Sequence, residues 1–183
     1  GRIPKLYKAG FKGVIYASTA TVDLCSIMLP DSGHIQEKEI EWVNKKRIRA
    51  GKAPSDPMYT AQDGIDSMEL FNGIEYEQEI VIDENIKFVM HDAGHMLGSS
   101  IIDIDVTENG RTEKIVFSGD LGNVNMPIIK DPTYIKGVDH LILETTYGDR
   151  EHGQMEDQSG KFIQILLDTI ERGGNVIIPS FAV

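Results

Sequence analysis

Two glycine-flanked loops constrain this chain more than any other feature. His95 lies in the first loop, Asp92–Ser99, and Asp120 lies in the second, Phe117–Gly122. Strand-like sequences lead into both loops and a hairpin separates them, so both loops should reach the same edge of one sheet. Neutral imidazole and carboxylate oxygen are ligands that zinc accepts. We therefore expect half of a metal site at this edge.

The residues alone leave the histidine ligand open. His91 precedes His95 by four positions, which is the spacing of zinc ligands on a helix, but Gly94 and Gly98 disfavour a helix there and indicate a loop. Either histidine is a candidate ligand, and an ordinary surface histidine is the competing interpretation. A simple Gly-Asp turn is the corresponding alternative for Asp120.

Composition indicates an intracellular globular protein. The 183 residues are 40% hydrophobic, enough for one sizeable core, and the single cysteine, Cys25, cannot form an internal disulfide. We read no membrane-spanning stretch and no signal peptide, so we expect a cytoplasmic protein. Cys25 sits in an apolar run, which suits a buried residue better than a catalytic thiol.

The charge balance opposes a broad nucleic-acid-binding surface. The formal net charge is -11, whereas phosphate binding is carried by clustered lysine and arginine. One basic cluster does occur, at Lys45–Arg49 with Lys52. We interpret it as a solvated helix face.

Hydrophobic periodicity predicts a mixed α/β chain. We expect helices over 1–10, from 19 or 21 to 29, from 31 to about 50, from 60 through a face containing Ile65, Met68 and Phe71, and around 162–170. Strands are expected over 13–18, as an antiparallel set between 77 and 117, over 138–144 and over 175–179. Asn109-Gly110 predicts a hairpin turn within the antiparallel set.

Four blocks in chain order resemble the β-CASP branch of the metallo-β-lactamase superfamily. They are Asp92–Ser99, Phe117–Gly122, Leu143–Arg150 and Ile178–Val183, and Asp31–Glu37 is similar to a further segment of that branch. The branch contains RNA-processing nucleases, including the cleavage subunit of the eukaryotic mRNA 3′-end machinery and shorter prokaryotic relatives. The resemblance spans essentially the whole chain.

The resemblance implies a fold and a set of site residues. The fold would be part of the α-β-β-α sandwich, with residues 1–150 in the metallo-β-lactamase core and 151–183 at the beginning of the β-CASP cap domain. His95 would be a ligand of one zinc ion and Asp120 would bridge two. Glu144 would orient a metal-site histidine, as carboxylates behind metal ligands do. We expect these three residues to carry the chemistry.

The other histidines have weaker assignments. His152 follows Leu143–Arg150 and is either a neighbour of the site or a solvated loop residue, while His34 and His140 are interpreted as structural.

The chain departs from the family pattern at its start. The His-x-His-x-Asp-His cluster that supplies most zinc ligands in the family is absent, and Gly1–Leu6 resembles the segment that follows that cluster. We expect the chain to begin directly after the cluster and to end just inside the β-CASP insertion, with further ligands beyond Val183.

The sequence therefore predicts a fragment of a zinc-dependent ribonuclease with RNA as its partner. Two alternatives stay open: a small-molecule hydrolase of thioester or lactam type on the same fold, and a catalytically silent folding or binding unit. The isolated chain, with two ligands, is expected to be inactive. Manganese accepts similar ligands. Missing strands would expose a sheet edge, so we expect a homodimer.

Overall fold

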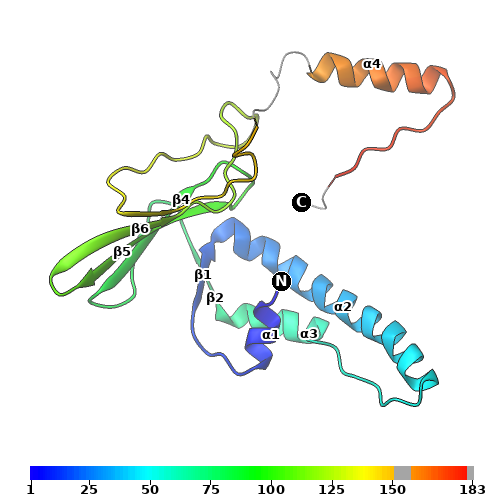
Figure 1. The fold of residues 1–183 in the computed structure, drawn as a ribbon, viewed down its shortest axis with the longest axis horizontal. Coiled ribbons are helices and arrows are strands. Elements are labelled where there is room, and N and C mark those ends of the chain that lie inside the picture. Colours follow the sequence, from blue (N-terminus) through cyan, green and yellow to red (C-terminus); the bar gives the residue numbers. More distant parts are fainter. Residues whose placement is uncertain (151–157, 181–183) are drawn as a thin grey trace. The chain divides into compact units, whose positions relative to one another are not determined.

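The computed structural model describes residues 1–150 and 158–180, which fall in two compact units, Gly1–Glu144 and Thr145–Val183. The first unit contains helices and two sheets (Figure 1). Its helical elements are α1 (Ile3–Lys8), α2 (Thr19–Arg49), α3 (Ala61–Asp66) and the 3-10 helix η1 (Ser67–Leu70). Its strands are β1 (Ile15–Ser18), β2 (Phe71–Ile74), β3 (Glu79–Val81), β4 (Ile86–Asp92), β5 (Ser100–Glu108), β6 (Arg111–Phe117) and β7 (His140–Ile142). The mixed α/β prediction is confirmed.

The strands form a parallel pair and a five-stranded sheet. β1 pairs with β2, whereas the larger sheet has the order β3-β4-β5-β6-β7, antiparallel except for the parallel β6–β7 pair. The predicted antiparallel set is confirmed, and so is its turn, because Asn109 and Gly110 have φ values of 52° and 76°. β4, β6 and β7 consequently end at one edge of the larger sheet.

Apolar side chains cover both faces of the larger sheet. On one face, Phe88 and Met90 of β4 pack with Ile74 of β2, and the ring of Tyr16 from β1 meets Phe88 edge-on at 5.5 Å. On the other face, a second buried cluster contains Ala93, Ile101 and Val116, covered by Leu121, Ile135 and Val138. The segment that follows Asp120 is thus packed against the sheet.

The prediction of two helices separated near Pro30 is wrong, because α2 runs through this position. It is one helix of 31 residues, with Ser18 as its N-cap and Pro30 in its interior. The Ser32 hydroxyl, expected to cap a new helix, is instead hydrogen-bonded to the Tyr59 hydroxyl at 2.7 Å. Contacts with the segment just before α3 therefore accompany a continuous helix in place of the local stop signal.

The helix predicted from residue 60 is shorter than expected. Thr60 caps it with a capping box to Asp63, but α3 ends at Asp66 and gives way to η1. Phe71, expected on the helix face, begins β2, a strand that the prediction missed. Pairing with β1 over four residues stabilises an extended backbone there.

The second unit contains α4 (Gln158–Glu171), which confirms the helix predicted around 162–170. The strand predicted over 175–179 is wrong, because these residues have no regular structure. A strand requires a hydrogen-bonding neighbour, and no described residue pairs with this segment. The domain boundary predicted at 150/151 stays a prediction.

Candidate metal centre

The loop after β4 is held by side chains that bond its own backbone. Asp92 Oδ1 accepts a hydrogen bond from Gly94 N at 2.9 Å, while Ser99 Oγ accepts from His95 N and Met96 N at 3.1 and 3.2 Å. These bonds fix the backbone on both sides of His95, whose imidazole is exposed. His95 lies in a loop, as expected.

Two glycines in this loop are required by close packing. Gly94 has φ +63°, and a Cβ there would lie 2.7 Å from the Lys130 carbonyl oxygen. Gly98 has φ +89°, and a Cβ there would lie 2.7 Å from Thr21 Oγ1. Any side chain at either position would be strained by both its backbone angle and its neighbours.

The same loop is attached to the start of α2. The Gly98 carbonyl accepts hydrogen bonds from Ser18 Oγ at 2.8 Å and Thr21 Oγ1 at 3.0 Å. The Tyr76 hydroxyl donates to the Ser99 carbonyl at 2.7 Å. His95 is therefore presented by a loop anchored to two other parts of the unit.

The loop after β6 brings Asp120 and Glu144 together. Ser118 N donates to the Ile142 carbonyl at 2.9 Å, and Glu144 N donates to Ser118 Oγ at 2.9 Å. Glu144 Oε1 then accepts from Leu121 N at 3.1 Å. The Glu144 carboxylate thus holds the peptide that directly follows Asp120, while the Asp120 side chain is exposed.

The two loops are in direct contact. Gly122 N donates to the Ala93 carbonyl at 2.9 Å, and a Cβ on Gly122 would overlap the Gly94 carbonyl. Gly119, at φ +56°, packs on the Ser100 carbonyl, which lies 2.8 Å from an ideal Cβ. The structure therefore brings the backbones around His95 and Asp120 to one edge of the sheet and joins Glu144 to them.

His91 has a different environment from His95. It lies within β4, with Nδ1 hydrogen-bonded to the Glu77 carboxylate at 2.8 Å and Nε2 buried at 3.5 Å from Asp103 Oδ2. Asp103 in turn accepts from Lys114 Nζ at 2.7 Å. Both ring nitrogens of His91 face carboxylates, which leaves His95 as the better candidate ligand.

The other histidines and the cysteine lie away from the two loops in the sequence. His140 Nε2 lies 2.9 Å from Glu113 Oε2, in keeping with a structural role, while His34 is exposed on α2 and His152 lies outside the described residues. Burial raises the pKa of the Cys25 thiol, which disfavours the nucleophilic thiolate.

His95 and Asp120 form only part of a zinc site among the described residues. Over residues 1–150 and 158–180, no three side chains of His, Cys, Asp or Glu gather in a way that could hold a metal ion. His95 and Asp120 have the right chemistry, but a catalytic zinc site needs three protein ligands for each metal. They fit as part of a donor set, not as a complete one.

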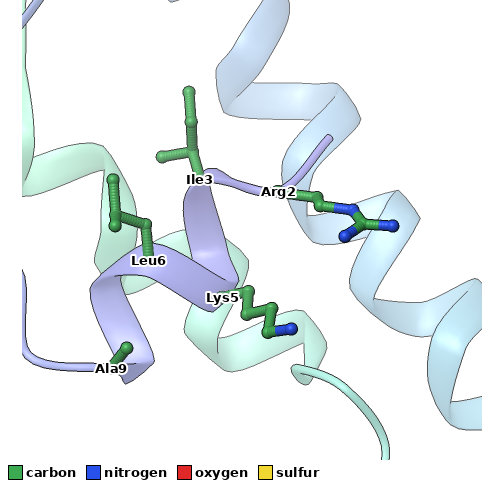
Figure 2. A pocket seen from close by; sticks show the side chains of 5 residues that line it. All are labelled: Arg2, Ile3, Lys5, Leu6 and Ala9. Atoms are coloured by element: carbon green, nitrogen blue, oxygen red, sulfur yellow. The ribbon is translucent and has the colours of Figure 1, made fainter.

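Two of the hollows in the first unit are compared with the candidate site. One lies along α1 and is lined by Arg2, Ile3, Lys5, Leu6 and Ala9 (Figure 2); it offers no metal-binding side chain. The other, of about 320 Å³, adjoins the Asp120 loop, and its lining includes Leu121, Gly122, Val124, Leu141 and Leu143. Of these two, the hollow beside the Asp120 loop is the one that adjoins the candidate site.

Sequence reasoning missed the side chains that support the loops. Ser99 and Ser118 hold the backbone at His95 and Glu144, yet each looks like an ordinary loop serine in the sequence. Their position beside the glycines was the available signal, because hydroxyls next to tight turns commonly bond the local backbone.

Comparison with known proteins identifies the relatives of this chain. It is 32% identical over all 183 residues to Ribonuclease TTHA0252 of Thermus thermophilus, and covers 37% of that protein. It is 29% identical along its whole length to the transcription termination factor FttA of Pyrococcus horikoshii, 26% of which it covers. Its homologues are ribonucleases and transcription termination factors.

A third relative is the RNase J-like protein of Methanocaldococcus jannaschii, 37% identical over 131 residues, which are 68% of this chain and 30% of that protein. The expected kinship with RNA-acting proteins is thus confirmed. The chain spans between a quarter and two fifths of the length of these relatives. No family model matches the sequence.

Proposed function

We propose that this chain is part of a metal-dependent ribonuclease of the β-CASP branch of the metallo-β-lactamase superfamily. The observation that carries the proposal is the direct contact between the His95 loop and the Asp120 loop, with Glu144 bonded beside Asp120. The whole-length similarity to named ribonucleases supports RNA as the substrate.

His95 and Asp120 would hold zinc, with Asp120 between two ions. Bound zinc supplies a Lewis acid for the phosphoryl group and activates water near neutral pH. Glu144 would be a positioning residue, since its carboxylate holds the Leu121 amide and so fixes the backbone that carries Asp120. The glycines let the backbones of the two loops approach closely, as a shared metal site would require.

The proposed protein is longer than this chain. Residues 1–150 would belong to its metallo-β-lactamase core and 151–183 to the start of a cap domain, while other segments would supply the remaining ligands. In support, the relatives are much longer than the aligned region. The isolated chain would be inactive, and the protein would act in the cytoplasm. Over the described ranges, every helix is too short or too polar to cross a membrane.

A small-molecule hydrolase is the second candidate. The apolar hollow of about 320 Å³ beside the Asp120 loop is large enough for an acyl chain of a thioester or a lactam side group. The relatives named as ribonucleases favour RNA over this alternative.

RNA cleavage tests the proposal. The longer protein is incubated with zinc and 5′-labelled single-stranded RNA as wild type, Asp120→Ala and Asp56→Ala; Asp56 is exposed and distant in sequence from both loops. We expect cleavage by the wild type and Asp56→Ala and at least a hundredfold loss in Asp120→Ala. Intact RNA together with hydrolysis of a thioester or lactam would refute the nuclease assignment.

A further inference from the structure

The C-terminal end of α2 carries a group of exposed residues that the proposed metal centre does not use. We call Trp42, Lys45, Lys46, Arg49 and Lys52 the α2 basic patch. All five are exposed. The first four are spaced i, i+3, i+4 and i+7 on the helix, which places them on one face.

This end of α2 is positively charged within an acidic chain. Residues 42–55 contain five lysines and arginines and no carboxylate, although the whole chain has 18 basic and 29 acidic residues. These five basic residues are the four cations of the patch and Arg47. Across the described part of the chain, none of them forms an ion pair with a carboxylate within 4.0 Å. Their charge is therefore available to an anionic partner.

Trp42 gives the patch an aromatic surface. Its side chain is 60% exposed, and Lys46 Nζ lies 3.5 Å from the ring centroid on one side. Exposed apolar side chains are common in this chain, but Trp42 is the one that lies among four exposed cations. An indole ring among ammonium and guanidinium groups offers stacking and charge at the same place.

The opposite face of the helix holds the patch rigid. Asn44 makes two hydrogen bonds of 2.8 Å with the Ser55 backbone, and Arg47 Nε donates to the Ala53 carbonyl at 2.8 Å. Lys52 N donates to the Arg47 carbonyl at 2.9 Å. The turn that carries Lys52 is thus fixed to α2, and Arg47 is used in doing so.

Cations at the end of a helix also have an ordinary role, because they offset the negative end of the helix dipole. That role explains Lys46 and Arg49 but not the exposed Trp42 ring. An acidic protein surface would also pair with these charges, and it is the alternative that the titration below separates. A single-stranded polynucleotide satisfies both the charges and the ring, since its phosphates pair with cations and each of its bases has a π-face.

We propose that the α2 basic patch is a docking site for single-stranded RNA, with a base stacked on Trp42 and phosphates on Lys45, Arg49 and Lys52. This inference rests on the proposed RNA substrate and adds a contact away from the metal centre.

Trp42 is the chain's only tryptophan, so its fluorescence reports directly on the patch. The chain is titrated in EDTA with a single-stranded 12-nucleotide oligoadenylate, or with poly-L-glutamate at equal charge. We expect the RNA to quench Trp42 emission strongly and poly-L-glutamate to leave it almost unchanged. Equal quenching by both, or binding of poly-L-glutamate alone, would overturn the proposal in favour of an acidic protein partner.

The affinities of variants for fluorescein-labelled oligoadenylate, measured by fluorescence anisotropy, then locate the site. The triple variant K45Q/R49Q/K52Q should bind at least tenfold more weakly, with a salt dependence reduced by about two in log-log slope. Trp42→Ala should bind about tenfold more weakly. The matched control K5Q/K136Q/K161Q removes the same charge from exposed lysines elsewhere and should bind within threefold of the wild type.

Equal affinity in the patch variant and its control would refute the docking site. Because binding is measured in EDTA, that result would leave the cleavage proposal standing, and a failed cleavage assay would leave the binding result standing.

Discussion

At the scale of single residues, the candidate centre depends on a glycine with an ordinary backbone angle. Gly122 is not in the positive-φ region, yet a Cβ on it would overlap the Gly94 carbonyl. The need for glycine at this position is therefore steric and comes from the other loop.

We expect Gly122→Ala to lower the free energy of unfolding by about 1–3 kcal/mol, because one loop must move away from the other. Urea denaturation measures the change. Gly148→Ala is the control, since Gly148 also lacks a positive φ and its nearest neighbouring atoms lie 3.3 Å from the added Cβ. Equal stability of the two variants would contradict the loop contact.

A second prediction at the residue scale concerns the ion pair between Asp103 of β5 and Lys114 of β6. Asp103 is only 7% exposed and accepts two hydrogen bonds from Lys114 Nζ, at 2.7 and 2.8 Å. Burial lowers the pKa of Lys114, but its hydrogen bonds to Asp103 and Asp105 outweigh this and raise the pKa above its ordinary value. Lys114 is therefore charged at neutral pH.

Lys114→Met should destabilise the chain by about 3 kcal/mol, because it leaves a buried carboxylate without its cation. Lys87→Met removes a more exposed pair, with Glu79 at 2.9 Å, and should cost much less, because water screens that pair. Chemical denaturation of both variants at pH 7 compares them. The opposite order would refute the account of the buried pair.

At the scale of elements, local signals predicted the start of α3 and the turn between β5 and β6 correctly. Thr60 and Gly110 act through neighbours three residues away or closer, and both predictions were correct. The helix break predicted at Pro30 is absent. Ser32, expected to cap a new helix there, bonds instead to Tyr59, which is distant in the sequence. β2 was missed for the same reason, since only β1 makes its backbone a strand.

The capping box of α3 predicts a pH effect. Burial raises the pKa of Asp63, but hydrogen bonds from Thr60 and the nearby Lys8 outweigh this and hold the pKa below its usual value. A carboxyl whose pKa is lower in the folded state stabilises the fold above its unfolded pKa, and this contribution is lost as the pH falls.

Urea denaturation at pH 7 and pH 3 should therefore show that Asp63→Asn costs about 1 kcal/mol at pH 7 and much less at pH 3. Asp66→Asn, in the same helix, serves as the control and should show a smaller difference. A cost for Asp63→Asn that does not change with pH would contradict the capping role.

At the scale of the whole molecule, the sequence predicted that two loops meet at one edge of the sheet but not how they are joined. The order of strands and glycines was enough to place His95 and Asp120 at one sheet edge. The bond from Gly122 to Ala93 and that from Leu121 to Glu144 link segments far apart in the chain, and no local pattern encodes them.

The expected homodimer is a prediction at the same scale. β7 is the last strand of the larger sheet, and its Leu141 and Ile142 side chains are 57% and 49% exposed. Such an edge favours association. Light scattering after size-exclusion chromatography should give twice the chain mass, and a monomer at all concentrations tested would rule the dimer out.

The central claim is that His95 and Asp120 hold metal, and the metal content of the longer protein tests it most directly. Plasma mass spectrometry would compare the wild type with His95→Ala, Asp120→Ala and the control His140→Ala, all purified with zinc and checked for folding by circular dichroism. We predict about two zinc ions per chain in the wild type and the control, as in two-metal hydrolytic sites. His95→Ala and Asp120→Ala should each lose at least one ion. Equal zinc content in all four proteins would contradict the account.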